Sequence, residues 1–233
     1  MAFIALDHYF IVMKGLCSLI LLLICIIPAS LIHAQDSQES FDKHALVFSV
    51  GFGGSGYNIN ENYSASSKPG RIFSTNFGTS SATYPVSVEY ALFKWLGIGV
   101  TGQFDSYYLK KDSISNFQPT AKGLELGLLF NLHLIRTRHV DFLAGASIGN
   151  SNFTENTDPN SDQLNGNCPW VNLNATLRYY FGRIGLYGSL GYQTMNYTSL
   201  TSNNSSLNKV LQYIPTSWAA KSESITFGLQ LRL

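Results

Sequence analysis

The sequence predicts an all-β chain: an eight-stranded antiparallel up-and-down transmembrane β-barrel that follows an N-terminal signal peptide. Three observations predict it. Apolar residues alternate with a period of two, short and long connections alternate, and aromatic residues gather near the strand ends. The clearest segment runs from Leu124 to Leu134, where every second residue is Leu or Phe. Because successive side chains leave a strand on opposite faces, this alternation indicates a strand, and its length suits the ~9–11 residues of a tilted bilayer-crossing strand.

The N-terminal end has the order of a secretory leader. Lys14 precedes a charge-free run rich in Leu and Ile, and small residues follow up to Ala34. This order predicts a signal peptide cleaved after Ala34. An uncleaved membrane anchor is the alternative, although a proline and a serine interrupt the run. The expected organisation is a signal peptide over residues 1–34, a short linker over 35–43 and one barrel domain over 44–233.

The overall composition excludes several kinds of partner and site. The chain carries 15 Lys and Arg against 14 Asp and Glu, and this near balance does not favour nucleic acid as a partner. Cys168 is the one cysteine after the predicted leader, so no internal disulfide is expected. Histidine and cysteine are too few and too scattered for metal-ligand spacing. We therefore expect no metal and no cofactor.

Reading the chain for a period of two predicts eight strands. Each has an apolar face, which we expect to meet lipid, and a face of small and polar residues, which we expect to meet the interior. Tyr84, Val86 and Val88, for example, alternate with Ser87 and Glu89. The predicted strands span residues 45–52, 84–93, 98–108, 124–134, 140–149, 170–181, 184–192 and 224–233.

The connections between these strands alternate in length. Short ones lie near residues 94–97, 135–139 and 182–183, and long polar ones near 57–82, 109–120, 150–169 and 197–217. Short periplasmic turns and long extracellular loops are typical of bacterial barrels. We therefore expect both chain ends on the periplasmic side and the long loops outside the cell.

Aromatic residues near the strand ends predict two belts at the two membrane–water boundaries. A simple preference of aromatic residues for strands is the alternative explanation. We expect the belt beside the short turns to contain Trp95, Phe142, Tyr179 and Phe181, and the belt beside the long loops to contain Tyr84, Phe104, Tyr108 and Trp170.

The leader, the eight alternating segments and the alternating last strand from Ile225 to Leu233 resemble the small porin-family outer-membrane β-barrels, in the size class of OmpA and OmpX. The resemblance covers about residues 44–233. It implies the outer membrane of a Gram-negative bacterium, contact with outer-membrane lipids, and recognition of the last strand by the barrel assembly machinery. Such barrels commonly end on an aromatic residue, whereas this chain ends on Leu233.

The predicted interior is narrow and polar. Eight strands leave a lumen that side chains just fill, and charges in so narrow a space need partners. We expect Glu89 and Arg178 to lie at comparable heights on strands opposite one another. A filled lumen is favoured over a conducting pore. The predicted polar network of the lumen comprises Glu89, Asp105, Glu125 and Arg178.

The leading functional hypothesis is a non-enzymatic barrel with a structural or surface-contact role through its long extracellular loops. Its alternatives are a porin-like channel for small solutes and an enzyme that modifies lipid A; a soluble lipocalin-like barrel is the rival fold. Such an enzyme needs a histidine beside a serine or an acid at the extracellular end. His44, His133 and His139 fall instead at the periplasmic end, so no catalytic residue is predicted. The external ligand is not predicted.

Overall fold

The computed structural model describes residues 40–64, 72–109, 119–156, 162–213 and 216–233. The chain divides into two units, residues 1–38 and 39–233, and all described residues belong to the second. The predicted signal peptide and most of the predicted linker lie outside the described residues.

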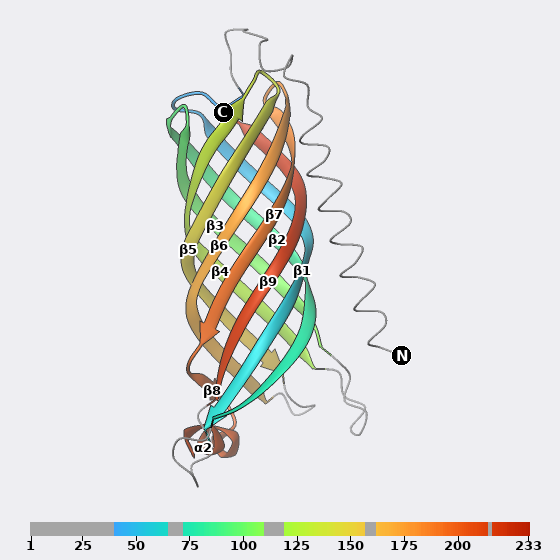
Figure 1. Cartoon of the computed structure of the whole chain (residues 1–233), viewed down its shortest axis with the longest axis vertical. Helices are drawn as coiled ribbons and strands as arrows, with labels where there is room; N and C mark the ends of the chain where they lie inside the picture. The colour runs from blue at the N-terminus through green and yellow to red at the C-terminus, as the bar shows by residue number, and fades with distance from the viewer. Residues whose placement is uncertain (1–39, 65–71, 110–118, 157–161, 214–215) are drawn as a thin grey trace. The chain divides into compact units, whose positions relative to one another are not determined.

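Eight long antiparallel strands close into a ring (Figure 1). Neighbours along the chain pair from β1 to β7, and β9 closes the ring by pairing with both β7 and β1. The predicted eight-stranded up-and-down barrel is thereby confirmed. The long strands are β1 (Leu46–Ser64), β2 (Ile72–Phe93), β3 (Leu96–Tyr108), β4 (Thr120–Arg136), β5 (Val140–Asn156), β6 (Gln163–Phe181), β7 (Ile184–Tyr197) and β9 (Thr216–Arg232).

Two small elements lie between β7 and β9. The short strand β8 (Leu200–Ser202) pairs with β6 at Leu164–Gly166, and the helix α2 (Ser205–Tyr213) follows it. Within the described part of the chain, no helix is both long and apolar enough to cross a membrane.

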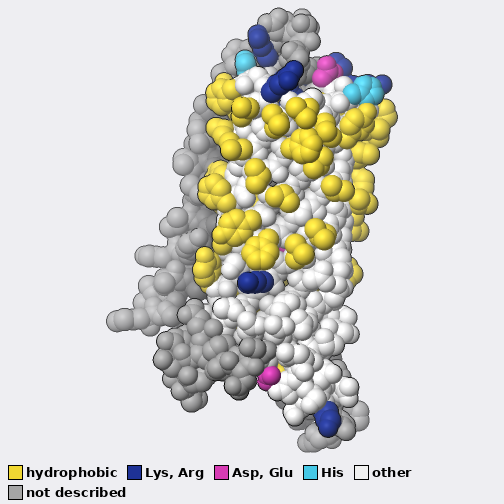
Figure 2. Space-filling view, turned by 180° about the vertical axis from the view of Figure 1, so that it is seen from behind, with side chains coloured by type: hydrophobic (Ala, Val, Ile, Leu, Met, Phe, Trp, Pro, Cys, Tyr) yellow, Lys and Arg dark blue, Asp and Glu magenta, His cyan; other side chains and the backbone are white. Residues whose placement is uncertain are grey.

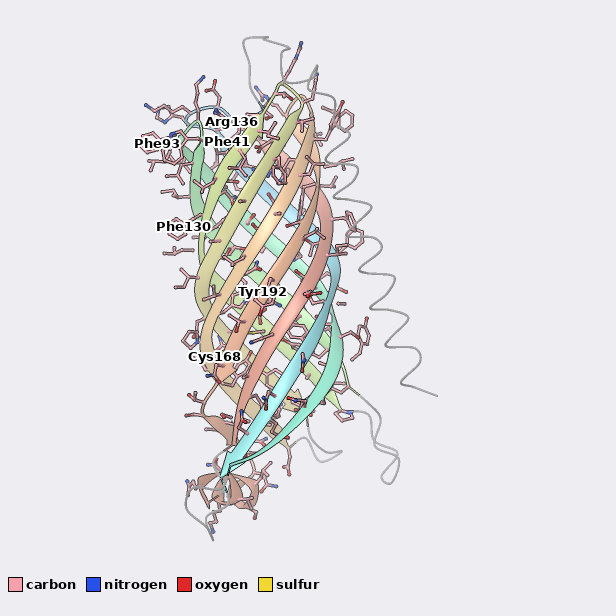
Figure 3. All side chains as sticks on the ribbon, in the orientation of Figure 1. Phe41, Phe93, Phe130, Arg136, Cys168 and Tyr192 are labelled. Atoms are coloured by element: carbon pink, nitrogen blue, oxygen red, sulfur yellow. The ribbon has the colours of Figure 1, made fainter. Side chains whose placement is uncertain are left out.

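An apolar belt surrounds the part of the barrel nearest the short turns (Figure 2). Phe93 and Phe130 point away from the barrel in Figure 3, and Val100 and Leu128 are each more than half exposed. Exposed apolar side chains in a continuous band are unfavourable in water and favourable against lipid. Charged side chains gather at the end of this belt where the short turns lie, as Figure 2 shows.

The strands continue well beyond the belt on the other side, which corrects the predicted loops. Most of 57–82 and 150–169 is strand, as the bounds of β1, β2, β5 and β6 show, whereas 197–217 holds the short strand β8 and the helix α2 between the ends of β7 and β9. Of the loop predicted at 109–120, residues 110–118 lie outside the described residues. We call these continuations the extension; it comprises residues 54–64, 72–82, 106–108, 120–123, 149–156, 163–170, 193–197 and 216–224.

The two faces of the strands exchange character where the belt gives way to the extension. Within the belt Leu126 and Leu128 face outward, whereas within the extension Asn152 and Asn167 face outward and Phe153 is buried inside. Because the outside of the extension meets water, its apolar residues pack into the interior. Strands predicted from outward apolar residues alone therefore end at the border of the belt, before the extension.

Six of the eight predicted belt residues are exposed on the barrel surface, and the prediction for Trp170 is wrong. Trp170 is only 1 % exposed and lies inside the barrel, because it is adjacent to the outward-facing Val171 and therefore has inward parity. Phe142 is half-buried, and Trp95, Tyr179, Phe181, Tyr84, Phe104 and Tyr108 are exposed.

Candidate functional site

Four ionisable side chains form a buried cluster at the end of the lumen where the short turns lie. Arg178 Nη2 on β6 lies 2.6 Å from Glu89 Oε2 on β2, across the ring, and Arg178 Nη1 lies 3.4 Å from Asp141 Oδ2 on β5. His133 on β4 lies between the acids, with Nε2 2.9 Å from Glu89 Oε1 and Nδ1 2.8 Å from Asp141 Oδ1. We call these residues the ionic quartet. It brings together Glu89 and Arg178 but neither Asp105 nor Glu125.

The contacts of the ionic quartet are consistent with one protonation state. Both ring nitrogens of His133 face carboxyl oxygens, and an imidazolium, which has two N–H donors, satisfies both contacts with ionised acids. The imidazolium and the guanidinium of Arg178 then balance the two carboxylates. Gly97 on β3 leaves the space that the Glu89 carboxylate occupies. The quartet is thus a neutral, hydrogen-bonded layer across the barrel.

The N-terminal segment of the described chain closes the mouth of the barrel over this layer, at the end where the short turns lie. The ring of Phe41 is fully buried and stacks on the His133 ring, with 3.4 Å between centroids and an interplanar angle of 11°. Ser40 donates from its backbone N to Thr137 O at 2.6 Å, and Arg232 Nη1 donates to Ser40 O at 2.6 Å. Figure 3 shows Phe41 at this end of the barrel. The segment therefore links the β4–β5 turn to β9 across the mouth.

A small polar cavity lies above the ionic quartet. Its volume is about 80 Å³, which suffices for a few water molecules. Amide oxygens of Asn131 and Asn174 lack protein partners and lie beside Gly145, whose missing side chain leaves them room. Arg178 Nε and Gln230 Oε1, which also line the cavity, lack partners as well. These atoms suit ordered water, which normally satisfies buried polar groups.

A second polar cluster, around Asp105, lies toward the extension. The carboxylate of Asp105 accepts hydrogen bonds from Thr83 Oγ1 at 2.5 Å, Tyr57 OH at 2.7 Å and Gln103 Nε2 at 2.9 Å. Gln193 accepts from Gln103 and from the Trp170 ring nitrogen. A buried carboxylate that accepts several hydrogen bonds is compensated for its loss of water. Trp170, which the sequence predicted in an aromatic belt, therefore lines the lumen.

Glu125 lies near this cluster and is fully buried. Its Oε1 accepts from Ser151 Oγ at 2.8 Å, and Ser151 is 2.8 Å from Tyr197 OH. Its Oε2 has no protein partner. Glu125 and Asp105 thus lie on the side of the lumen nearest the extension, apart from the quartet that contains Glu89 and Arg178.

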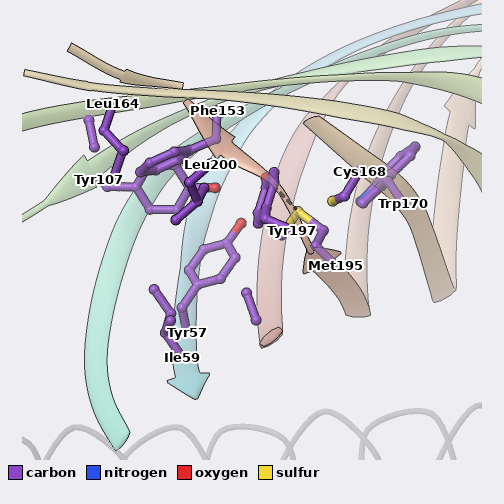
Figure 4. Close-up of a cluster of buried hydrophobic side chains, with 12 residues drawn as sticks. Tyr57, Ile59, Tyr107, Phe153, Leu164, Cys168, Trp170, Met195, Tyr197 and Leu200 are labelled. Atoms are coloured by element: carbon purple, nitrogen blue, oxygen red, sulfur yellow. Dashed lines mark hydrogen bonds between the residues drawn. The ribbon is translucent and has the colours of Figure 1, made fainter. Parts of the chain in front are cut away.

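Apolar and aromatic side chains fill the interior of the extension (Figure 4). Rings pack edge to face, as for Tyr57 and Tyr107 at 5.0 Å and for Phe153 and Trp218 at 5.3 Å between centroids. We call this set the aromatic plug; its buried members are Tyr57, Ile59, Tyr107, Ala121, Phe153, Leu164, Cys168, Trp170, Met195, Tyr197, Leu200 and Ala220.

Cys168 belongs to β6 and to the aromatic plug, and not to a loop. Burial raises the pKa of its thiol to about 11. The thiolate is the reactive form of cysteine, so a neutral buried thiol does not act as a nucleophile at physiological pH.

Glu155 on β5 makes the stability of the extension depend on pH. Burial, followed by repulsion from Glu61, raises the pKa of Glu155 from 4.5 to about 7. The folded state therefore holds this proton more tightly than the unfolded state, and stability falls as pH rises from about 4.5 through about 7. We expect Glu155→Gln to raise the urea midpoint of unfolding in vesicles at pH 8 and to leave it unchanged at pH 4.

The matched control for this variant is Glu223→Gln on the exposed face of β9. It removes one carboxylate that water solvates, so the same increase at pH 8 is not expected. An equal increase in both variants would attribute the effect to net charge and contradict the assignment to Glu155.

Comparison with known proteins identifies the fold. No family model matches the chain, and no curated protein matches its sequence. Among solved structures, the outer membrane protein OprG from Pseudomonas aeruginosa matches 83 % of this chain and 97 % of its own, with a TM-score of 0.52 and 12 % identity.

Two further solved structures are more distant in shape. Neisserial surface protein A matches 78 % of this chain and 97 % of its own, with a TM-score of 0.48 and 12 % identity. The outer membrane protease OmpT from Escherichia coli matches 85 % of this chain and 99 % of its own, with a TM-score of 0.49 and 9 % identity. Together with the closed ring of strands and the apolar belt, the match to OprG shows that this chain has the fold of the small outer-membrane β-barrel proteins.

Proposed function

We propose that the protein is a closed outer-membrane barrel that acts through the extracellular surface of its extension, and neither transports solutes nor catalyses a reaction. The observation that carries this proposal is the filling of the lumen at successive levels. Phe41 and the ionic quartet close the periplasmic end, and the aromatic plug closes the extracellular end. The cavity between them, at about 80 Å³, is too small to serve as a solute path.

Planar-bilayer recording tests the closed lumen. We expect the purified barrel to insert without producing conductance steps, while a porin inserted under the same conditions produces them. The Phe41→Ala variant should also remain silent, because the ionic quartet and the aromatic plug still close the path. Discrete steps in the wild type whose size changes with Glu89→Gln would show an open lumen and favour the channel.

The enzyme alternative predicts a different result. A barrel that modifies lipid A would change the acyl pattern of lipid A when it is overexpressed. We expect identical lipid A mass spectra from deletion and overexpressing strains. The chain has no histidine in the extension to act as a base, and the buried Cys168 is not activated as a nucleophile. A changed acyl pattern would contradict the proposal.

A further inference from the structure

The outward faces of β4, β5 and β6 carry a ladder of hydrogen-bonded polar side chains in the extension. Asn167 Nδ2 donates to Asn152 Oδ1 at 2.6 Å, and Thr154 Oγ1 donates to Asn165 Oδ1 at 3.0 Å. Asn156 Nδ2 donates to Thr120 Oγ1 at 3.2 Å. Since alternate residues of a strand share a face, the three bonds follow one another along β5. We call this set the amide ladder; it comprises Thr120, Asn152, Thr154, Asn156, Asn165 and Asn167.

The surroundings of the amide ladder on β5, β6 and β7 are uncharged. Asn150, Pro169, Thr194 and Asn196 are exposed on the same wall, and none of them or of the ladder residues carries a charge. Two exposed lysines border it: Lys122 pairs with Thr154 in the β4–β5 register, and Lys221 pairs with Thr194 in the β7–β9 register. A surface designed only for solubility would carry roughly 25–35 % charged residues. Solubility alone therefore does not account for this amide-rich composition.

The position of the ladder determines what it faces. Ile148 on β5 and Val171 on β6 are paired and exposed, and they are the last outward aliphatic residues of these two strands before the ladder begins. Asn150 and Pro169 form the next outward pair, and the ladder pair Asn152 and Asn167 comes after them. The outward side chains of the amide ladder therefore lie next to the apolar belt, at the level of the lipid headgroups.

The chemistry of the ladder suits hydroxyl groups. An amide offers two donors and two acceptor sites, and the bond between Asn167 and Asn152 uses only part of this capacity. The ladder holds these amides in place, so less side-chain entropy is lost when they bind a ligand. Phosphate recognition relies on arginine and lysine, and among the described residues these lie only at the borders of the ladder surface, as Lys122 and Lys221.

We propose that the amide ladder binds the sugar part of the glycolipids that surround the barrel in the outer leaflet. Neutral ring hydroxyls then pair with the free donors and acceptors of the ladder, and the acyl chains lie against the apolar belt. This inference rests on the proposed function, because it treats the extension as the functional part of the barrel.

Unfolding in vesicles of defined composition tests the inference. Three preparations are needed: phosphatidylcholine alone, phosphatidylcholine with lipid A, and phosphatidylcholine with lipopolysaccharide that carries a complete core oligosaccharide. A ligand that binds only the folded state raises its stability. We expect the urea midpoint of the wild type to be higher with core lipopolysaccharide than with lipid A. The triple variant Asn152→Ala, Asn165→Ala, Asn167→Ala should lose this increase.

The matched control removes three outward amides from the opposite wall, by Asn58→Ala, Asn62→Ala and Asn76→Ala on β1 and β2, and should keep the increase. An increase kept by the ladder variant, or one that lipid A alone produces in full, would overturn the inference. If the ladder variant fails to fold, the wild type still decides the question. Core lipopolysaccharide with a photoreactive sugar should cross-link to β5 and β6 peptides, and cross-links confined to other strands would overturn the inference.

The outcome is separable from that of the proposed function. A conducting lumen would refute the closed barrel and leave the sugar contact to be judged by the vesicle experiment. An absent sugar effect with a silent bilayer would refute the ladder site alone.

Discussion

Arg178→Met is expected to destabilise the barrel by about 3–5 kcal/mol, because it leaves the buried carboxylates of Glu89 and Asp141 with His133 as their one remaining cation in the quartet. Methionine keeps much of the volume, so the loss reports mainly on charge. Urea unfolding in vesicles, followed by heat-modifiable gel mobility, measures it. The double variant with Glu89→Gln should recover part of the loss, since it removes one unpaired charge.

Arg183→Met, in the exposed β6–β7 turn, is the control for this substitution and should change stability little. Strictly additive effects of Arg178→Met and Glu89→Gln would show that the two residues do not interact in the membrane-embedded protein. That result would remove the ionic quartet as a closing layer.

Leu128→Arg is expected to destabilise the inserted barrel by about 2–4 kcal/mol. Leu128 on β4 is 54 % exposed within the apolar belt and pairs with the equally exposed Ile148. A charge placed there must leave water for hydrocarbon, and the cost is greatest near the middle of the bilayer. Unfolding of the barrel in phosphatidylcholine vesicles measures the effect.

Asn150→Arg is the matched control, because Asn150 is the next outward position beyond Ile148 and lies at the border of the belt, where it pairs with Leu126. It should cost at most about 1 kcal/mol, the value for charges near the interface. Equal costs at both positions would mean that the belt does not mark the hydrocarbon layer.

The number of strands and their inward and outward faces could be predicted because alternation is a local pattern that lipid enforces. The contact between Glu89 and Arg178 followed from parity and height on opposite strands. The strand ends could not be found in the same way. Beyond the belt the apolar residues lie on the inner face of the strands, as Trp170 and Phe153 do. The alternation of apolar and polar residues thus shifts by one position, and a sequence with such a shift resembles a loop. This shift of the apolar residues from the outer to the inner face is the signal that would have revealed the extension.

Other parts of the site depend on tertiary contacts that no local pattern contains. His133 and Asp141 meet across a register shift between β4 and β5, next to a short turn. Phe41 lies before the first strand and is placed by contacts with β4, β9 and a turn far along the chain. The amide ladder likewise requires the register of β5 with β6, which pairs Asn152 with Asn167.

The exchange of faces between belt and extension gives the barrel a fixed depth in its membrane. If the barrel sank by one pair of residues, Asn150 and Pro169 would enter hydrocarbon; if it rose by as much, Ile148 and Val171 would meet water. Both displacements raise the free energy, so the depth of the barrel in the bilayer is restored after a shift in either direction. A bilayer thicker or thinner than the belt must therefore stretch or compress around the protein, and membranes of matching thickness should retain it preferentially.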